Sequence, residues 1–90
     1  MKGLIIGQVA QIGKVQEFGE KGFKKQEVII KTLEEYPNVY CVEFTGKNTS
    51  LVNSFAINDN VRIDVNIRGR EYTSEKGNYS VFHSINAWKV

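Results

Sequence analysis

The sequence predicts an all-β domain in which five strands close into a small barrel, with one short helix. Three observations support this. Apolar and polar residues alternate along most of the chain, as in strands that bury one face. Glycine, asparagine or proline separates the alternating stretches, and only one stretch has helical spacing. Ninety residues suffice for one core, so we expect a single domain over residues 1–90.

The first expected strand covers residues 4–15 and must bend. Ile5 and Val9 are at odd positions and would face one side of the strand, whereas Ile12 is at an even position and would face the other. A bend at a glycine or a bulge explains this slip, and it lets a sheet curl into a barrel. Residues 16–22 are expected to form a loop. Phe18 in this loop either packs back onto the domain or stacks on a base at an exposed tip.

The second expected strand, residues 23–32, has two different faces. Val28 and Ile30 lie on the side that suits a core, because side chains alternate between the faces of a strand. The other side combines lysines with apolar and acidic residues: Phe23, Lys25, Glu27, Ile29 and Lys31. That mixture fits a platform for a polyanion with flat apolar parts, or an ordinary solvated face.

A turn at Pro37 leads to the third expected strand, residues 39–45. Its apolar face carries Val42 and Phe44 and is assigned to the core. Cys41 lies on the opposite face and is expected to be half-buried. No basic partner in the sequence marks its thiol as a nucleophile.

The remaining chain supplies the helix and two more strands. Residues 46–57 have apolar residues at helical spacing and offer Asn48, Thr49 or Ser50 as an amino cap. Residues 61–68 alternate cleanly, residues 69–78 are expected to be a long, partly extended hairpin connection, and residues 79–90 form the last strand. Arg62 and Arg68 share the outward face with Asp64, so we expect surface pairing there rather than phosphate binding.

The order of these elements is that of an OB-fold, a five-stranded Greek-key barrel with one short helix between strands 3 and 4. The position of the helix favours this fold over an SH3-like barrel, and a sandwich would need more strands.

Four short motifs also resemble those of a family of short single-domain OB-fold proteins of largely uncharacterised function. They are Lys24-Lys25-Gln26-Glu27, Tyr36-Pro37, Arg70-Glu71-Tyr72 and Ala87-Trp88-Lys89. More distantly, Gly77-Asn78-Tyr79 followed by Ile85 is similar to the corresponding region of bacterial single-stranded DNA-binding proteins. The resemblance implies a related activity.

A binder of single strands needs cations along a groove and flat side chains between them. In an OB-fold the second and third strands and two hairpin loops converge on one face. We therefore predict non-catalytic binding of single-stranded DNA, before RNA, as a possible homo-oligomer. The predicted binding residues are Phe18, Lys21, Phe23, Lys25, Lys31, Arg70, Tyr72 and Lys76. Trp88 is expected to be a packing or subunit-contact residue.

The competing interpretation is a protein-interaction or assembly module without affinity for nucleic acid. A formal net charge of +2 permits a local basic patch without requiring one. No catalytic constellation is present, and one cysteine with one histidine cannot build a structural zinc site. We expect no enzyme activity, cofactor, metal or membrane span, and a cytoplasmic location in a bacterial or phage-infected cell.

Overall fold

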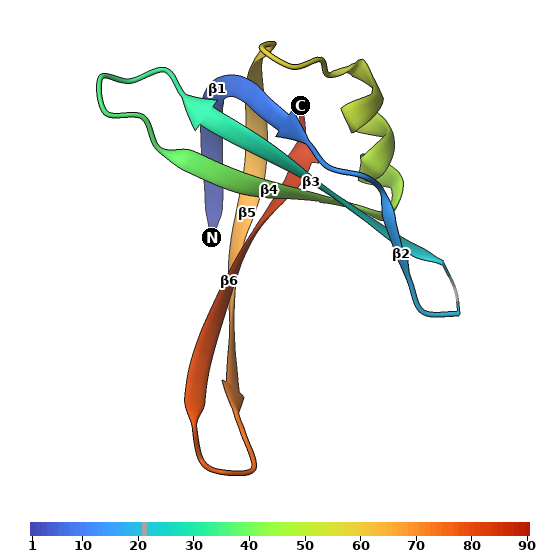
Figure 1. Cartoon of the computed structure of the whole chain (residues 1–90), viewed down its shortest axis with the longest axis vertical. Helices are drawn as coiled ribbons and strands as arrows, with labels where there is room; N and C mark the ends of the chain where they lie inside the picture. The colour runs from blue at the N-terminus through green and yellow to red at the C-terminus, as the bar shows by residue number, and fades with distance from the viewer. Residues whose placement is uncertain (21) are drawn as a thin grey trace.

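The alternating stretches form six strands and one short helix in the computed structural model, which describes residues 1–20 and 22–90 (Figure 1). The elements in chain order are β1 (Lys2–Ile12), β2 (Gln16–Phe18), β3 (Phe23–Thr32), β4 (Val39–Thr45), η1 (Gly46–Ser54), β5 (Asn60–Thr73) and β6 (Tyr79–Lys89). The five long strands are those that the sequence predicts. β2 is an addition, because it lies inside the segment expected to be a loop.

The strands close into a barrel because β1 bends and pairs on both sides. The sheet order is β1-β5-β6-β4-β3-β2, and an additional pairing of β1 with β3 completes the ring. The first part of β1 pairs with β5, and its later part pairs with β3 across a register shift between Val9 and Gln11. At the crossover a Cβ on Gly7 would lie 2.6 Å from the Lys31 carbonyl oxygen. The predicted bend in this strand is confirmed.

The core lies inside this ring. It consists of Ile5, Val9, Val28, Ile30, Val42, Phe44, Val52, Ile63, Val65 and Ala87. Two polar side chains are buried with it, and both are hydrogen-bonded. Gln26 Nε2 donates to the Gly13 carbonyl oxygen at 2.8 Å, and Thr32 Oγ1 accepts from the Asn38 backbone N–H at 2.8 Å. Pairing of this kind offsets the cost of burying polar groups.

The helix covers one side of the barrel but differs in type from the expected one (Figure 1). η1 is a 3-10 helix that begins at Gly46, so the predicted amino caps lie inside it. The hydroxyls of Thr49 and Ser50 instead donate to the carbonyl oxygens three residues earlier, both at 2.9 Å. Val52 is buried, and the helix is followed by Phe55, whose ring packs edge-on against Phe44 with centroids 5.7 Å apart.

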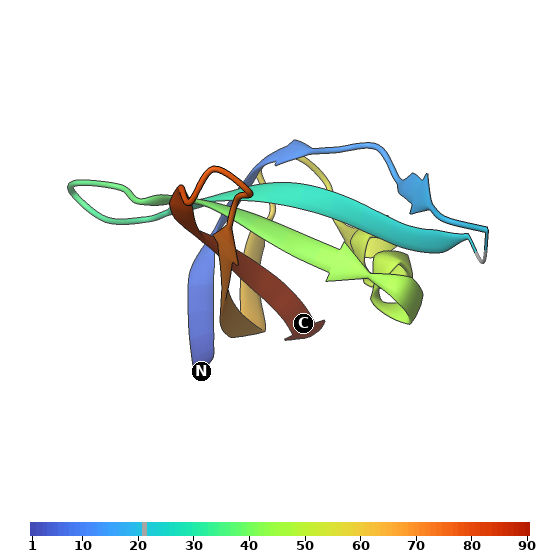
Figure 2. The ribbon, with the colours of Figure 1, turned by 90° about the horizontal axis from the view of Figure 1, so that it is seen from below.

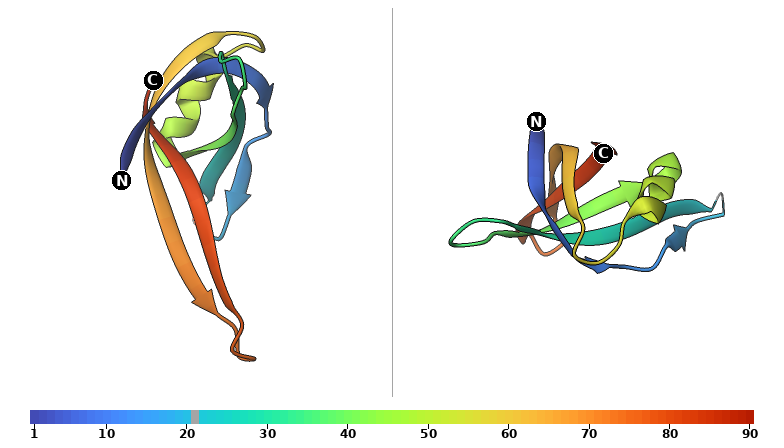
Figure 3. Two further views of the ribbon diagram at one scale, coloured as in Figure 1. Left: turned by 90° about the vertical axis from the view of Figure 1, so that its left-hand side faces the viewer. Right: turned by 90° about the horizontal axis from the view of Figure 1, so that it is seen from above.

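The most prominent departure from the predicted boundaries is a two-stranded arm. β5 and β6 stay paired from Asp64 and Lys89 out to Thr73 and Tyr79, so half of the predicted hairpin connection, residues 69–73, is strand. Figures 1 and 3 show this hairpin projecting away from the barrel, and Figure 2 shows it towards the viewer. The radius of gyration is 14.6 Å, against about 12 Å expected for a compact domain of this length.

The arm leaves the barrel at a weak seam between β4 and β6. These two strands are parallel, and their only described pairing is between Glu43 and Asn86. Beyond this point β6 continues with β5 into the arm, while β4 continues with β3 towards the helix (Figure 1). The divergence leaves a groove between the two pairs of strands.

Candidate nucleic-acid interface

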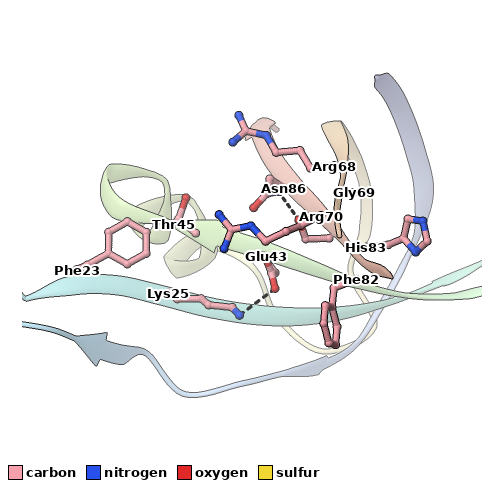
Figure 4. Close-up of a pocket in the computed structure, with 11 residues that line it drawn as sticks. Phe23, Lys25, Glu43, Thr45, Arg68, Gly69, Arg70, Phe82, His83 and Asn86 are labelled. Carbon is pink, nitrogen blue, oxygen red and sulfur yellow. Dashed lines mark hydrogen bonds and ion pairs between the residues drawn. The ribbon is translucent and has the colours of Figure 1, made fainter. Parts of the chain in front are cut away.

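The groove at the seam has a volume of about 710 Å³ and opens to solvent. One side is formed by the arm and the other by the outward face of β3 and β4. Its lining residues are Phe23, Lys25, Glu43, Thr45, Arg68, Gly69, Arg70, Phe82, His83, Ser84 and Asn86. Figure 4 shows all of them as sticks. Three are fixed cations and one is a carboxylate.

The arm side of the groove is cationic and aromatic. Arg68 lies opposite Ser84 and Arg70 lies opposite Phe82 in the β5–β6 ladder, so all four share one face. Both guanidinium groups extend to the same side of the arm (Figure 4). Within the described part of the chain, neither arginine takes part in an ion pair. Their charges are therefore available to an anionic ligand.

The opposite side of the groove holds an ion pair. Lys25 Nζ lies 2.9 Å from Glu43 Oε1 and 3.6 Å from Glu27 Oε1. The hydrogen bond to Glu43 raises the pKa of Lys25 above its ordinary value, so the ammonium stays charged. Two carboxylates beside one ammonium leave little positive charge for a phosphate. This side is polar but not cationic.

Phe23 and Phe82 present rings at this groove, and both are unusually exposed. Their exposed fractions are 53% and 62%. Phe23 lies opposite Phe18 in the β2–β3 ladder, and Phe18 is 49% exposed. Three large apolar rings at the surface of so small a domain indicate a binding surface.

A family model described as "Domain of unknown function (DUF3127)" matches residues 4–90. The chain belongs to this family. No curated protein sequence matches it significantly.

Solved structures share the fold at low sequence identity. The mitochondrial single-stranded DNA-binding protein of S. cerevisiae has a TM-score of 0.72 and 11% identity, covering 99% of this chain and 90% of that one. A small single-stranded DNA-binding protein from Streptomyces coelicolor has a TM-score of 0.54 and 17% identity, covering 100% and 89%. The predicted OB-fold is thereby confirmed.

Of the predicted binding residues, the structure brings Phe23, Lys25 and Arg70 together at the groove. Phe18 lies next to Phe23, on the short strand that replaces part of the expected loop. Of its two expected states, the exposed one is observed.

The other predicted residues lie farther away. Tyr72 is exposed on the arm, two residues beyond Arg70 on the same face and opposite Ser80. Lys76 is exposed in the turn at the tip of the arm. Lys31 is exposed on β3 opposite Val39 and is not a lining residue. Lys21 lies outside the described residues.

The groove residues that were missed or misjudged from the sequence include Arg68, Phe82 and Glu43. Arg68 was expected to pair with Asp64, but the ion pairs of the described residues all involve Lys25, and Arg68 lines the groove. The available signal was the alternation of β5, which continues from Arg68 to Arg70 on one face. Glu43 gave no local signal, because its role depends on where β6 passes β4.

Neither Cys41 nor Trp88 is buried in the core. Cys41 was expected to be half-buried but is exposed, and its thiol donates a hydrogen bond to Glu27 Oε2 at 3.4 Å. Partial desolvation and then this hydrogen bond raise the pKa of the Cys41 thiol. Trp88 is about half exposed, with Lys2 Nζ 6.0 Å from its ring centroid. This arrangement is a weak cation–π contact on the surface.

No three described His, Cys, Asp or Glu side chains are grouped so that they could hold a metal ion. Among the described residues, no helix is long and apolar enough to cross a bilayer.

Proposed function

We propose that this protein binds single-stranded nucleic acid, DNA in the first place, in the groove between the β5–β6 arm and the β3–β4 face. The observation that carries the proposal is one groove with exposed phenylalanine rings and two arginines that form no ion pair with any described residue. The proposed function is binding alone, without a chemical reaction in the groove.

The chemistry of the groove suits a single strand better than a duplex. Arginine forms bidentate hydrogen bonds with phosphate, so Arg68 and Arg70 would hold the sugar-phosphate backbone along the arm. Bases that are not paired can stack on Phe82 and Phe23, at about 1 to 3 kcal/mol per base. In a duplex the same base faces are already stacked on their neighbours.

The structural neighbours support the proposal through their fold and their described binding partner. Both are named as single-stranded DNA-binding proteins, and both share the barrel with this chain across nearly its whole length. Identities of 11% and 17% leave the binding residues to be argued from this chain alone.

Fluorescence anisotropy of labelled oligonucleotides tests the proposed function. Single-stranded probes should bind more tightly than duplexes of the same length. Affinity should fall as salt rises, with a log-log slope of about −0.7 per neutralised phosphate. Absence of measurable affinity for single strands at low salt would overturn the proposal and favour a protein-interaction module.

A second property is favoured by the outward face of β1. We propose that this face supports self-association, because Leu4 and Ile6 are exposed there and Trp88 is half exposed nearby. An apolar patch of this kind is typical of a subunit contact. Measurement of the mass in solution should show an oligomer, and Ile6→Glu should shift it towards the monomer. A monomeric wild-type protein at micromolar concentration would contradict this.

A further inference from the structure

The two sides of the groove differ in charge, and this difference indicates how a bound single strand would be oriented. The arm offers Arg68 and Arg70 without carboxylate partners in the described chain, whereas Lys25 on the β3–β4 side is paired with Glu43 and Glu27. A phosphate would meet net repulsion on the β3–β4 side. The backbone of a bound strand should therefore follow the arm, and its bases should point towards β4.

The group that such a base meets is the carboxylate of Glu43. Only 21% of this side chain is exposed, and its Oε1 already accepts from Lys25 Nζ at 2.9 Å. The salt bridge holds the carboxylate at the seam, where Glu43 lies beside Asn86 (Figure 4). An ionised carboxylate only accepts hydrogen bonds, so it binds a base that presents a hydrogen-bond donor.

Bases differ in what they offer at this position. Cytosine carries an amino group at the ring carbon where thymine carries the carbonyl O4, and adenine also presents an amino group. A carboxylate attracts the amino group and repels the carbonyl oxygen. The β3–β4 side of the groove would therefore distinguish bases by their exocyclic group, not by their size.

We infer that Glu43 is a specificity-determining residue and that the groove prefers bases with an exocyclic amino group over thymine. This inference rests on the proposed function, since it assigns a base preference to the same groove. It predicts that a strand of cytosines binds more tightly than a strand of thymines, although both are pyrimidines with the same backbone charge.

The test compares oligo-dC with oligo-dT of equal length by anisotropy at pH 8, where cytosine is neutral. Wild-type protein should bind oligo-dC about 3- to 10-fold more tightly, which is the range of one net hydrogen bond. Glu43→Gln should strengthen binding to oligo-dT, because a repelling charge is removed, and should bring the dC/dT ratio close to one.

Glu27→Gln is the matched control. It removes the same charge from the same lysine, but Glu27 is not a lining residue of the groove. It should strengthen binding to both probes equally and leave the dC/dT ratio unchanged. A second probe, with 2-pyrimidinone in place of cytosine, removes the amino group without altering the protein. It should lose the advantage of oligo-dC.

The outcomes separate the inference from the proposed function. A wild-type dC/dT ratio near one, with clear binding to both probes, would overturn the base preference and leave single-strand binding intact. If Glu43→Gln and Glu27→Gln shift the dC/dT affinity ratio equally, the preference comes from the overall charge near Lys25 and not from Glu43 itself, and the inference about Glu43 is wrong. Absence of binding to either probe would overturn the proposed function and the inference together.

Discussion

The two halves of strand β5 show how one regular element serves two purposes. In the barrel half, Ile63 and Val65 are fully buried. In the arm half, Arg70 and Tyr72 are exposed, although from Val65 to Thr73 the ladder with β6 runs on without a further register shift. The backbone is the same, and only the surroundings differ. Stability should therefore depend on the barrel half, and ligand binding on the arm half.

Folding stability alone does not explain the aromatic residues of the arm. An isolated two-stranded hairpin is marginally stable in water, because neither face has a core to cover it. Exposed Phe82 and Tyr72 add little to the stability of such a ribbon. Their presence is accounted for if a ligand covers them. This difference between barrel and arm can be tested with matched substitutions.

The largest effect is expected for a pair of phenylalanines. Phe44→Ala should lower the free energy of unfolding by about 3 to 5 kcal/mol, because it leaves a cavity in the core beside Phe55. Phe82→Ala should change it by less than about 0.5 kcal/mol but should weaken single-strand binding by about 1 to 3 kcal/mol. Urea unfolding and anisotropy measure the two effects. A large stability loss for Phe82→Ala would mean that its ring is packed in solution.

The next effect concerns the arginines of the arm. Arg68→Gln with Arg70→Gln should lower affinity about 10- to 100-fold and make the salt slope shallower by about 1.4. The melting temperature should stay the same, since both side chains are exposed and outside any described ion pair.

Arg62→Gln is the control for this pair. Arg62 is exposed on the same strand but lies opposite Ile6 on β1, away from the groove. Its replacement should leave the salt slope unchanged. Equal effects of all three arginines would mean that binding follows overall charge and not this groove.

A pair of glycines tests the same comparison through the backbone. Gly7→Ala should destabilise the protein by about 1 to 3 kcal/mol, because the added Cβ meets the Lys31 carbonyl oxygen where β1 crosses β3. Gly69→Ala on the arm should be close to neutral, since the nearest atom, His83 Cδ2, lies 3.7 Å from the added Cβ. Thermal unfolding distinguishes them, and equal losses would contradict a tightly packed crossover with an open arm.

The smallest effect concerns thiol reactivity. Cys41 should react with iodoacetamide at pH 8 more slowly than an ordinary thiol, because its raised pKa lowers the thiolate fraction. Glu27→Gln should speed the reaction, since it weakens the hydrogen bond and removes a nearby charge. A cysteine placed on the arm, Ser80→Cys in a Cys41→Ser background, should react at the ordinary rate. Faster reaction of Cys41 than of this arm thiol would contradict the assigned contact.

Local pattern predicted most of the barrel but not the full length of the paired arm. Val28, Ile30, Val42 and Phe44 alternate with polar neighbours, and all four are buried as expected. Residues 69–78 contain glycine and charged residues with no apolar face, so the pattern indicated only a partly extended hairpin connection. Strand continues there because cross-strand hydrogen bonds need no buried face, and the barrel below holds both strands in register.

The candidate site was predicted only in part for a similar reason. Phe23, Lys25 and Arg70 were identified by residue type and by the usual ligand face of the fold. The sequence could not show that Lys25 is paired with Glu43, or that Arg68 lies free of Asp64. The Lys25–Glu43 pair depends on the register between β3 and β4, and the place of Arg68 depends on where the arm leaves the barrel, so neither follows from a local pattern.

The amino-acid order alone determined which residues of each strand face inwards, because neighbouring side chains of an extended chain must point to opposite sides. The tertiary structure decided that a groove exists and what charge each side of it carries. Both depend on the point where β6 leaves β4, and that point is fixed by the closure of the whole ring.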